Sequence, residues 1–217
     1  MGEVEINTNT RQVIIHSAFF FYGTAADEII SRQVSLDIAT HWNEAMGTVI
    51  IKGTTYGVHF NIEGNWVPGL VPETIFENIN PRYNYFRIEA FAETDISFVD
   101  AIGSNTGYFK LDNLLNNSTT AAHEYGHTLG LKHPRILDTR GQGVPGIMYP
   151  RGTICDPAFQ YNPLAAPLEA GGTINPFCRR VLQADIDRLR LTKLNFDRRG
   201  FATIGEFTSI WHERHLR

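Results

Sequence analysis

The sequence predicts an α+β fold, in which a long helix covers one face of a β-sheet and a second helix carries a group of histidines. Strand-like runs rich in β-branched and aromatic residues occupy much of the first half of the chain. A long amphipathic pattern follows the first run, and a stretch without periodicity occupies residues 134–176. Because the chain has 217 residues, we expect one domain over residues 1–217, with an upper part at about 1–133 and a smaller lower part at about 134–217.

The first predicted elements are a buried strand and a long helix. The strand spans residues 12–22, is rich in β-branched and aromatic side chains, and ends at Gly23. Thr24 and Asp27 stand at capping spacing before a helix whose apolar residues recur every four positions, at Ile30, Val34, Ile38 and Trp42. A long helix with one apolar stripe needs a sheet to cover.

Further strands are predicted at residues 48–52, 55–62 and 85–91. Turn-rich connections separate them, at residues 63–65 and at Asn80-Pro81. A shorter strand is predicted at residues 107–111. If it lies at the sheet edge, its unpaired backbone groups could bind an extended peptide as an added strand, and an ordinary hairpin arm is the alternative.

Three helices are predicted in the second half of the chain, at residues 120–130, 179–194 and 204–216. Residues 116–120 supply N-cap candidates for the first of these, and Thr203 and Glu206 stand at capping-box spacing for the last. The second helix carries basic residues that we expect on its solvated face, namely Arg179, Arg180, Arg188, Arg190 and Lys193.

Composition argues against two classes of partner. The formal net charge is −4 and no basic stripe is present, so nucleic acid is not an expected partner. The longest apolar run, around residues 13–21, is shorter than the roughly 18 residues that span a bilayer, so no membrane span is predicted. The first ten residues are polar and acidic and contain no secretory signal peptide.

Cys155 and Cys178 either form a disulfide or stay reduced, and the sequence gives the two alternatives equal weight.

Three of the eight histidines stand in one stretch, AAHEYGHTLGLKHP. On an α-helix His123 and His127 lie on one face and can present ring nitrogens to a single point. Gly130 can take a positive φ and end the helix, which lets His133 return toward that point. Glu124, one position round the helix, can reach a water bound to a metal there. The sequence therefore predicts a metal site with three histidine ligands.

The donor set favours Zn²⁺ as the cofactor. Three neutral imidazoles that leave one tetrahedral position open are typical of a catalytic zinc site. Zinc lowers the pKa of a bound water toward about 7, and Glu124 can take its proton as a general base. Calcium is possible, but no motif indicates it. Apart from the terminal pair His212 and His215, three positions apart, the other histidines show no comparable spacing; they are His16, His41 and His59.

The pattern from His123 to His133, HExxHxxGxxH, resembles the elongated zinc-binding motif of the metzincin metallopeptidases. That clan also has a methionine in a tight turn beneath the metal. Gly146-Ile147-Met148-Tyr149-Pro150 is similar to this turn, so the resemblance implies that Met148 forms the hydrophobic floor of the site. The helix looks like the serralysin version and the turn like the matrixin version. Pro150 stands where a serralysin turn would place a tyrosine ligand, so no tyrosine ligand is implied.

The resemblance implies a metzincin-like fold, with a mixed twisted sheet, a backing helix, an active-site helix and an irregular and helical lower subdomain. It also implies a single catalytic domain that acts as a zinc endopeptidase on protein or peptide substrates, with a metal-bound water activated by Glu124. Residues 149–161 would then wall the pocket for the side chain after the cleaved bond, where we expect an apolar preference.

Two rival functions remain open at this point. One is a zinc-binding effector or interaction domain with narrow or no proteolytic activity, and the other is hydrolysis of a non-peptide amide. We expect a monomer. We also expect a secreted or translocated protein, because a free peptidase would be hazardous in the cytoplasm.

Overall fold

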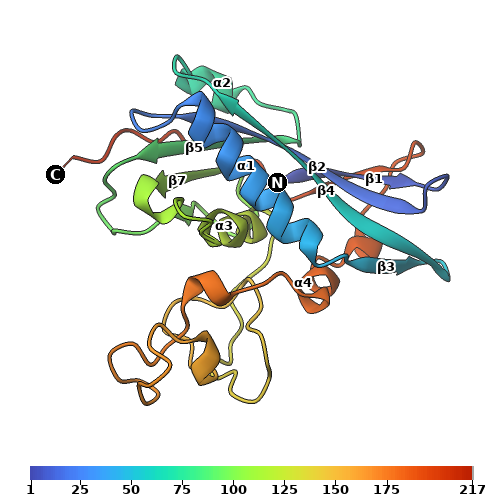
Figure 1. The fold of residues 1–217 in the computed structure, drawn as a ribbon. Helices are drawn as coiled ribbons and strands as arrows, with labels where there is room; N and C mark the ends of the chain where they lie inside the picture. The colour runs from blue at the N-terminus through green and yellow to red at the C-terminus, as the bar shows by residue number, and fades with distance from the viewer. Residues whose placement is uncertain (217) are drawn as a thin grey trace.

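The computed structural model describes residues 1–216 and has the predicted α+β class. Its centre is a curled, mixed eight-stranded sheet, with α1 and α3 beside it and an irregular part below it (Figure 1). Six strands follow one another across the sheet in the order β3 (Thr48–Ile51), β4 (Thr54–Trp66), β2 (Gln12–Tyr22), β5 (Tyr83–Glu89), β7 (Thr106–Lys110) and β6 (Phe98–Val99). The two remaining strands extend the sheet beside the first half of β2 and are β1 (Gly2–Asn7) and β8 (Phe201–Ile204).

The central strand β2 has the predicted bounds and is parallel to both β4 and β5. Its side chains alternate, so that Ile15, Phe19 and Phe21 are buried in the main core. The partner strand β1, which lies antiparallel to β2, was not predicted because its first residues read as polar. In the sheet Glu3 and Glu5 face outward and Val4 faces the core, which is an ordinary strand alternation.

Helix α1 (Glu28–Glu44) covers the core face of the sheet, as predicted. Asp27 caps it by accepting a hydrogen bond from the Ile30 backbone N–H at 2.7 Å. The turn expected at residues 63–65 is wrong, because β4 continues through it to Trp66. Gly64 permits a close approach of helix and strand, since a Cβ there would lie 2.2 Å from Ser35 Oγ of α1.

The strand predicted at residues 107–111 is β7, but it does not lie at the sheet edge. The short strand β6 pairs antiparallel with β7 and forms that end of the sheet. Helix α3 (Thr120–Thr128) follows β7 after a 3₁₀ turn at Leu111–Asn113. It packs against α1 and carries the histidine motif beneath the sheet.

The irregular part contains mostly turns, with 3₁₀ turns at Pro157–Phe159, Pro176–Cys178 and Leu191–Lys193. The helix expected at residues 179–194 is shorter than predicted: α4 spans Gln183–Arg188, and Arg190 takes a left-handed φ of 52° that stops it. The remaining helix is α2 (Pro72–Phe76), a single short turn before β5. Cys155 and Cys178 are both free thiols, so the structure favours the reduced alternative.

The helix expected at residues 204–216 is wrong. Its first residue ends strand β8, Gly205 turns the chain with a φ of 94°, and the following residues up to 216 have no regular structure. Of the apolar residues that suggested a helix face, Trp211 instead stacks on Tyr22 of the sheet with ring centroids 4.8 Å apart, while Phe207 and Ile210 are exposed. None of the described helices is long and apolar enough to cross a bilayer.

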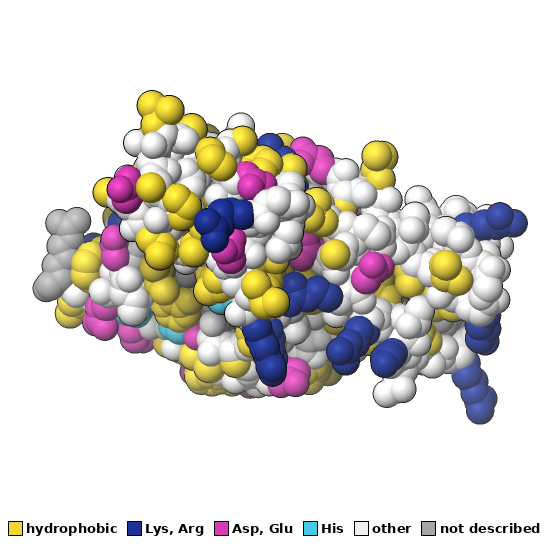
Figure 2. Space-filling model, turned by 90° about the horizontal axis from the view of Figure 1, so that it is seen from below, with side chains coloured by type: hydrophobic (Ala, Val, Ile, Leu, Met, Phe, Trp, Pro, Cys, Tyr) yellow, Lys and Arg dark blue, Asp and Glu magenta, His cyan; other side chains and the backbone are white. Residues whose placement is uncertain are grey.

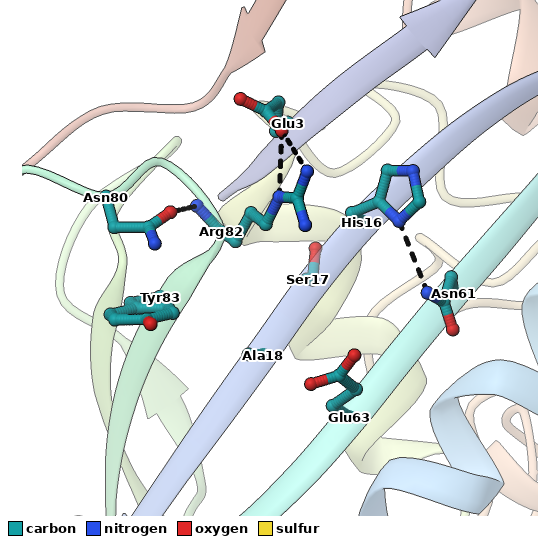
Figure 3. Close-up of a pocket in the computed structure, with 9 residues that line it drawn as sticks. All are labelled: Glu3, His16, Ser17, Ala18, Asn61, Glu63, Asn80, Arg82 and Tyr83. Carbon is teal, nitrogen blue, oxygen red and sulfur yellow. Dashed lines mark hydrogen bonds and ion pairs between the residues drawn. The ribbon is translucent and has the colours of Figure 1, made fainter.

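A polar pocket of about 360 Å³ lies on the sheet face opposite α1 and α3 (Figure 3). Two side-chain contacts join residues of its lining. Arg82 donates to Glu3, and the His16 ring lies 3.2 Å from the Asn61 side-chain amide. The exposed Glu63 also lines this pocket. The histidine motif lies on the other side of the sheet, so this pocket is separate from the site described next.

Candidate metal centre

The motif helix α3 is fixed by contacts with α1 and β2. The Trp42 indole of α1 donates to the Ala122 carbonyl at 3.0 Å, and the Tyr125 hydroxyl lies 2.8 Å from Ser17 Oγ of β2. The Trp42 and Tyr125 rings also meet edge to face, with centroids 5.7 Å apart. These contacts with α1 and β2 therefore fix the position of α3 and its rotation about its own axis.

The structure brings the three predicted ligands together. His133 Nε2 lies 3.0 Å from His123 Nε2 and 3.1 Å from His127 Nε2. Gly130 has a φ of 91°, the positive value expected for the turn that returns His133 to the helix. The rings of His123 and His127 are buried and that of His133 is exposed. These three histidines lie close enough to hold a metal ion.

The hydrogen bonds of the ring Nδ1 atoms test whether the site fits a metal. His123 Nδ1 lies 2.7 Å from the Ile147 carbonyl and His127 Nδ1 lies 2.7 Å from the Leu131 carbonyl. A carbonyl only accepts, so a proton on each Nδ1 satisfies these two contacts and leaves each Nε2 with a lone pair. A single proton on His133 Nε2 can satisfy only one of its two neighbours. A tetrahedral metal with nitrogen at about 2.0–2.1 Å would place the ligand atoms about 3.4 Å apart, close to the observed spacing.

Burial keeps the three imidazoles neutral. It lowers the pKa of His123 well below its ordinary value and the pKa of His127 to about 4, and it also lowers the pKa of His133. Neutral imidazole is the form that binds metal. At neutral pH the ligands therefore need no deprotonation before an ion can bind.

Glu124 is buried beside the three histidines. Burial raises the pKa of its carboxyl group to about 8, against the opposing effects of the Arg179 charge and of a hydrogen bond from the Val99 backbone. Val99 belongs to the edge strand β6, so the carboxyl group lies between the motif helix and the sheet edge. The environment holds Glu124 close to the pH at which it can both take and release a proton.

Two cavities open on either side of the histidines. One, of about 220 Å³, has His123, Glu124, Arg151 and Arg179 in its lining, and we call it the Arg179 pocket. The other, of about 520 Å³, is lined by His127 and Lys132 together with residues 96–99. Ile96, Ser97, Glu124 and two of the histidines border both, so the two cavities form one cleft that runs along the sheet edge. On the face shown in Figure 2, the visible histidine side chains are partly covered by their neighbours.

Met148, which the resemblance implied as the floor of the site, lies against the motif helix at Gly126. It is fully buried, and a Cβ added at Gly126 would lie 2.3 Å from its sulfur atom. The turn that carries Met148 is held by Asp185 of α4, whose carboxylate accepts from the Leu182 N–H at 3.0 Å and from the Ile147 N–H at 3.4 Å. The lower part of the chain thus reaches the site through this turn.

The contact between Gly126 and Met148 gives a stability prediction. Gly126→Ala is expected to destabilise the metal-free protein by about 1–2 kcal/mol, because the displaced Met148 outweighs the better helix propensity of alanine. Denaturant unfolding measures the change. Gly57→Ala is the matched control, since a Cβ at Gly57 meets nothing within 4 Å. A Gly126→Ala protein as stable as the wild type would contradict the packing described.

Arg179 is the residue of the site that sequence reasoning missed. We expected it on a solvated helix face, but it lies before α4 and is only 4% exposed. Its guanidinium donates to the Tyr149 carbonyl at 3.0 Å and approaches His123 Nδ1 to 2.9 Å. Burial lowers its pKa to about 10, which leaves it charged at neutral pH. Nothing in the local pattern distinguishes it from the exposed Arg180.

The candidate residues thus share one region: His123, Glu124, His127 and His133 at the cleft, with Gly130 and Met148 supporting them. No second group of three or more potential metal ligands is found in the part of the chain that the structure describes. A comparison of the chain with protein-family models and with curated proteins finds no match in either.

Proposed function

We propose that the chain is a zinc-dependent endopeptidase of the metzincin type, with Glu124 as its general base. The observation that carries this proposal is the set of three histidine Nε2 atoms that face one another beside a buried carboxyl group in an open cleft. An inert structural zinc site closes all four positions with protein ligands, whereas the described residues supply only three.

Zinc held by His123, His127 and His133 would supply Lewis acidity toward a water molecule and toward the peptide carbonyl. Glu124 accepts the proton of the attacking water on its carboxylate. The same carboxyl group then gives that proton to the nitrogen of the departing amine, so the residue returns to its starting state.

The substrate would lie extended along the sheet edge. Strand β6 pairs only with β7 among the described strands, and residues 96–99 line the cleft, although the Val99 backbone already bonds Glu124. An extended peptide can pair with such an edge and present its backbone to Glu124 and the histidines. We therefore propose β6 as the peptide-binding edge, since β7 is a hairpin arm paired with β6, which was the alternative considered for it.

The proposal is tested by incubating the purified, zinc-loaded protein with an unfolded protein and with a peptide library, with and without a chelator. We expect cleavage that is lost with the chelator, restored by added zinc and absent in Glu124→Ala. Glu63→Ala is the matched control, because Glu63 is exposed on the opposite face of the sheet. Bound zinc without any cleavage would instead support a zinc-binding interaction domain.

A further inference from the structure

The guanidinium of Arg179 is buried without a carboxylate partner. Its Nε donates to Thr119 Oγ1 at 3.0 Å and to the Pro176 carbonyl at 3.3 Å, and one of its terminal nitrogens, Nη1, donates to the Tyr149 carbonyl. The approach of Nη1 to His123 is a contact only, because that ring nitrogen already carries a proton. Every group that Arg179 bonds is therefore neutral, and no ion pair involves it among residues 1–216.

The second terminal nitrogen of Arg179, Nη2, has no hydrogen-bond partner among the described residues. This nitrogen is not fully enclosed by other atoms, and the Arg179 side chain lines the Arg179 pocket. The neutral bonds of Nε and Nη1 hold the guanidinium plane in place. One donor is thus left free in a fixed orientation, in a cavity that adjoins the histidines.

The charges around this pocket favour an anion. Arg151 lines the same pocket and is exposed, so two cations border a cavity of about 220 Å³. Glu124 is the only acidic residue in the lining, and its carboxyl group is engaged with the proton transfer proposed above. The charge of Glu124 acts on Arg179 without forming an ion pair with it. A carboxylate supplied by a ligand would therefore give this buried cation a charge-assisted hydrogen bond that no described residue provides.

We propose that the Arg179 pocket binds an aspartate or glutamate side chain of the substrate next to the scissile bond. This inference rests on the proposed peptidase function and makes Arg179 a specificity-determining residue. It replaces the apolar preference that the sequence led us to expect for the pocket beside residues 149–161. A cation held by neutral groups discriminates strongly between a carboxylate and its amide analogue, because only the carboxylate carries a negative charge that pairs with the cation.

Matched peptides that differ only in Glu or Gln beside the cleaved bond give the first test, after a library profile has located that bond. We expect the wild type to prefer the Glu peptide about tenfold or more in kcat/KM. Arg179→Gln should bring this ratio close to one, and Arg179→Lys, which keeps the charge, should retain part of it. Arg180→Gln is the matched control, since Arg180 is the exposed neighbour and bonds only backbone carbonyls.

A binding measurement separates this inference from the peptidase proposal. Two peptide hydroxamates that differ only in a Glu or Gln side chain next to the chelating group are titrated calorimetrically into zinc-loaded Glu124→Ala protein. We expect the Glu compound to bind about tenfold more tightly, and this difference to vanish when Arg179→Gln is added. If no peptide is ever cleaved but this difference holds, the peptidase proposal fails and the pocket assignment stands.

Two results would overturn the assignment. The first is a wild-type Glu/Gln ratio near one in both cleavage and hydroxamate binding, which decides the matter whether or not the Arg179 variants fold. The second is an acidic preference that persists unchanged in folded, zinc-loaded Arg179→Gln protein, since Arg179 would then only position the Tyr149 turn. Melting temperature and zinc content are measured for every variant.

Discussion

The variant Glu124→Gln is expected to hydrolyse peptides about a thousandfold more slowly than the wild type while it keeps its zinc, because general-base catalysis is lost and no ligand is removed. Glutamine has nearly the same shape as glutamate and can keep the contact with the Val99 backbone. It cannot accept a proton from water at neutral pH. Steady-state kinetics on a cleaved peptide and metal analysis of the same preparation measure the two quantities.

The same variant changes the pH dependence of stability in the metal-free protein. The pKa of Glu124 is raised by burial from its usual 4.5 to about 8, so the folded state binds more protons than the unfolded state between these values. The stability that this group contributes is complete below pH 4.5 and is lost as the pH rises toward 8. Glu124→Gln removes that loss of stability, and we expect a higher melting temperature than for the wild type at pH 8 without metal.

For the catalytic prediction, zinc loss or unchanged catalysis in Glu124→Gln would contradict the role given to Glu124.

His127→Ala is expected to lower the affinity for zinc by more than about a hundredfold, which exceeds the effect of removing an outer hydrogen-bond partner of a ligand. The substitution deletes one of the three facing Nε2 atoms. It also leaves the Leu131 carbonyl without its 2.7 Å partner in a buried turn, which costs about 1–3 kcal/mol of folding stability. Competition with a chromophoric chelator measures the affinity, and peptide hydrolysis at equimolar zinc should fall below detection.

The control for this variant is His59→Ala, because His59 lies on β4 with an exposed side chain. It should bind zinc as tightly as the wild type. Equal loss of zinc in both variants would point to a general effect of removing histidines. Undiminished zinc binding in His127→Ala would show that the ion, if any, binds elsewhere.

The fold was predictable where local pattern and tertiary packing agree. The strand at residues 12–22 and the helix with its cap at Asp27 were confirmed because their apolar periodicities match the faces they bury. Strand β1 was missed because it is short and its outward-facing glutamates make the segment look polar, which hides the alternation of polar and apolar residues. The helix at 204–216 was wrong because Phe207, Ile210 and Trp211 have helical spacing, which pattern alone cannot distinguish from an irregular segment laid along a sheet.

The candidate site was predictable to the extent that its residues are close in sequence. His123, His127 and His133 are fixed by one helix and one turn, so their spacing carries the geometry. Arg179 lies 56 residues after His123 in the chain and reaches it through long-range packing of an irregular segment. No periodicity records such a contact, so its burial could be found only from the folded chain.

The pairing of β1 with β8 joins the two ends of this fold, since Gly2 lies opposite Ile204 in the register. Contacts so far apart in sequence raise the contact order and slow folding, because a very long loop must close before they form. During synthesis the outer edge of β1 has no partner until residue 204 has left the ribosome. The chain between these strands includes the whole cleft, so the last part of the sheet to assemble is also the part that encloses the active region within one closed sequence.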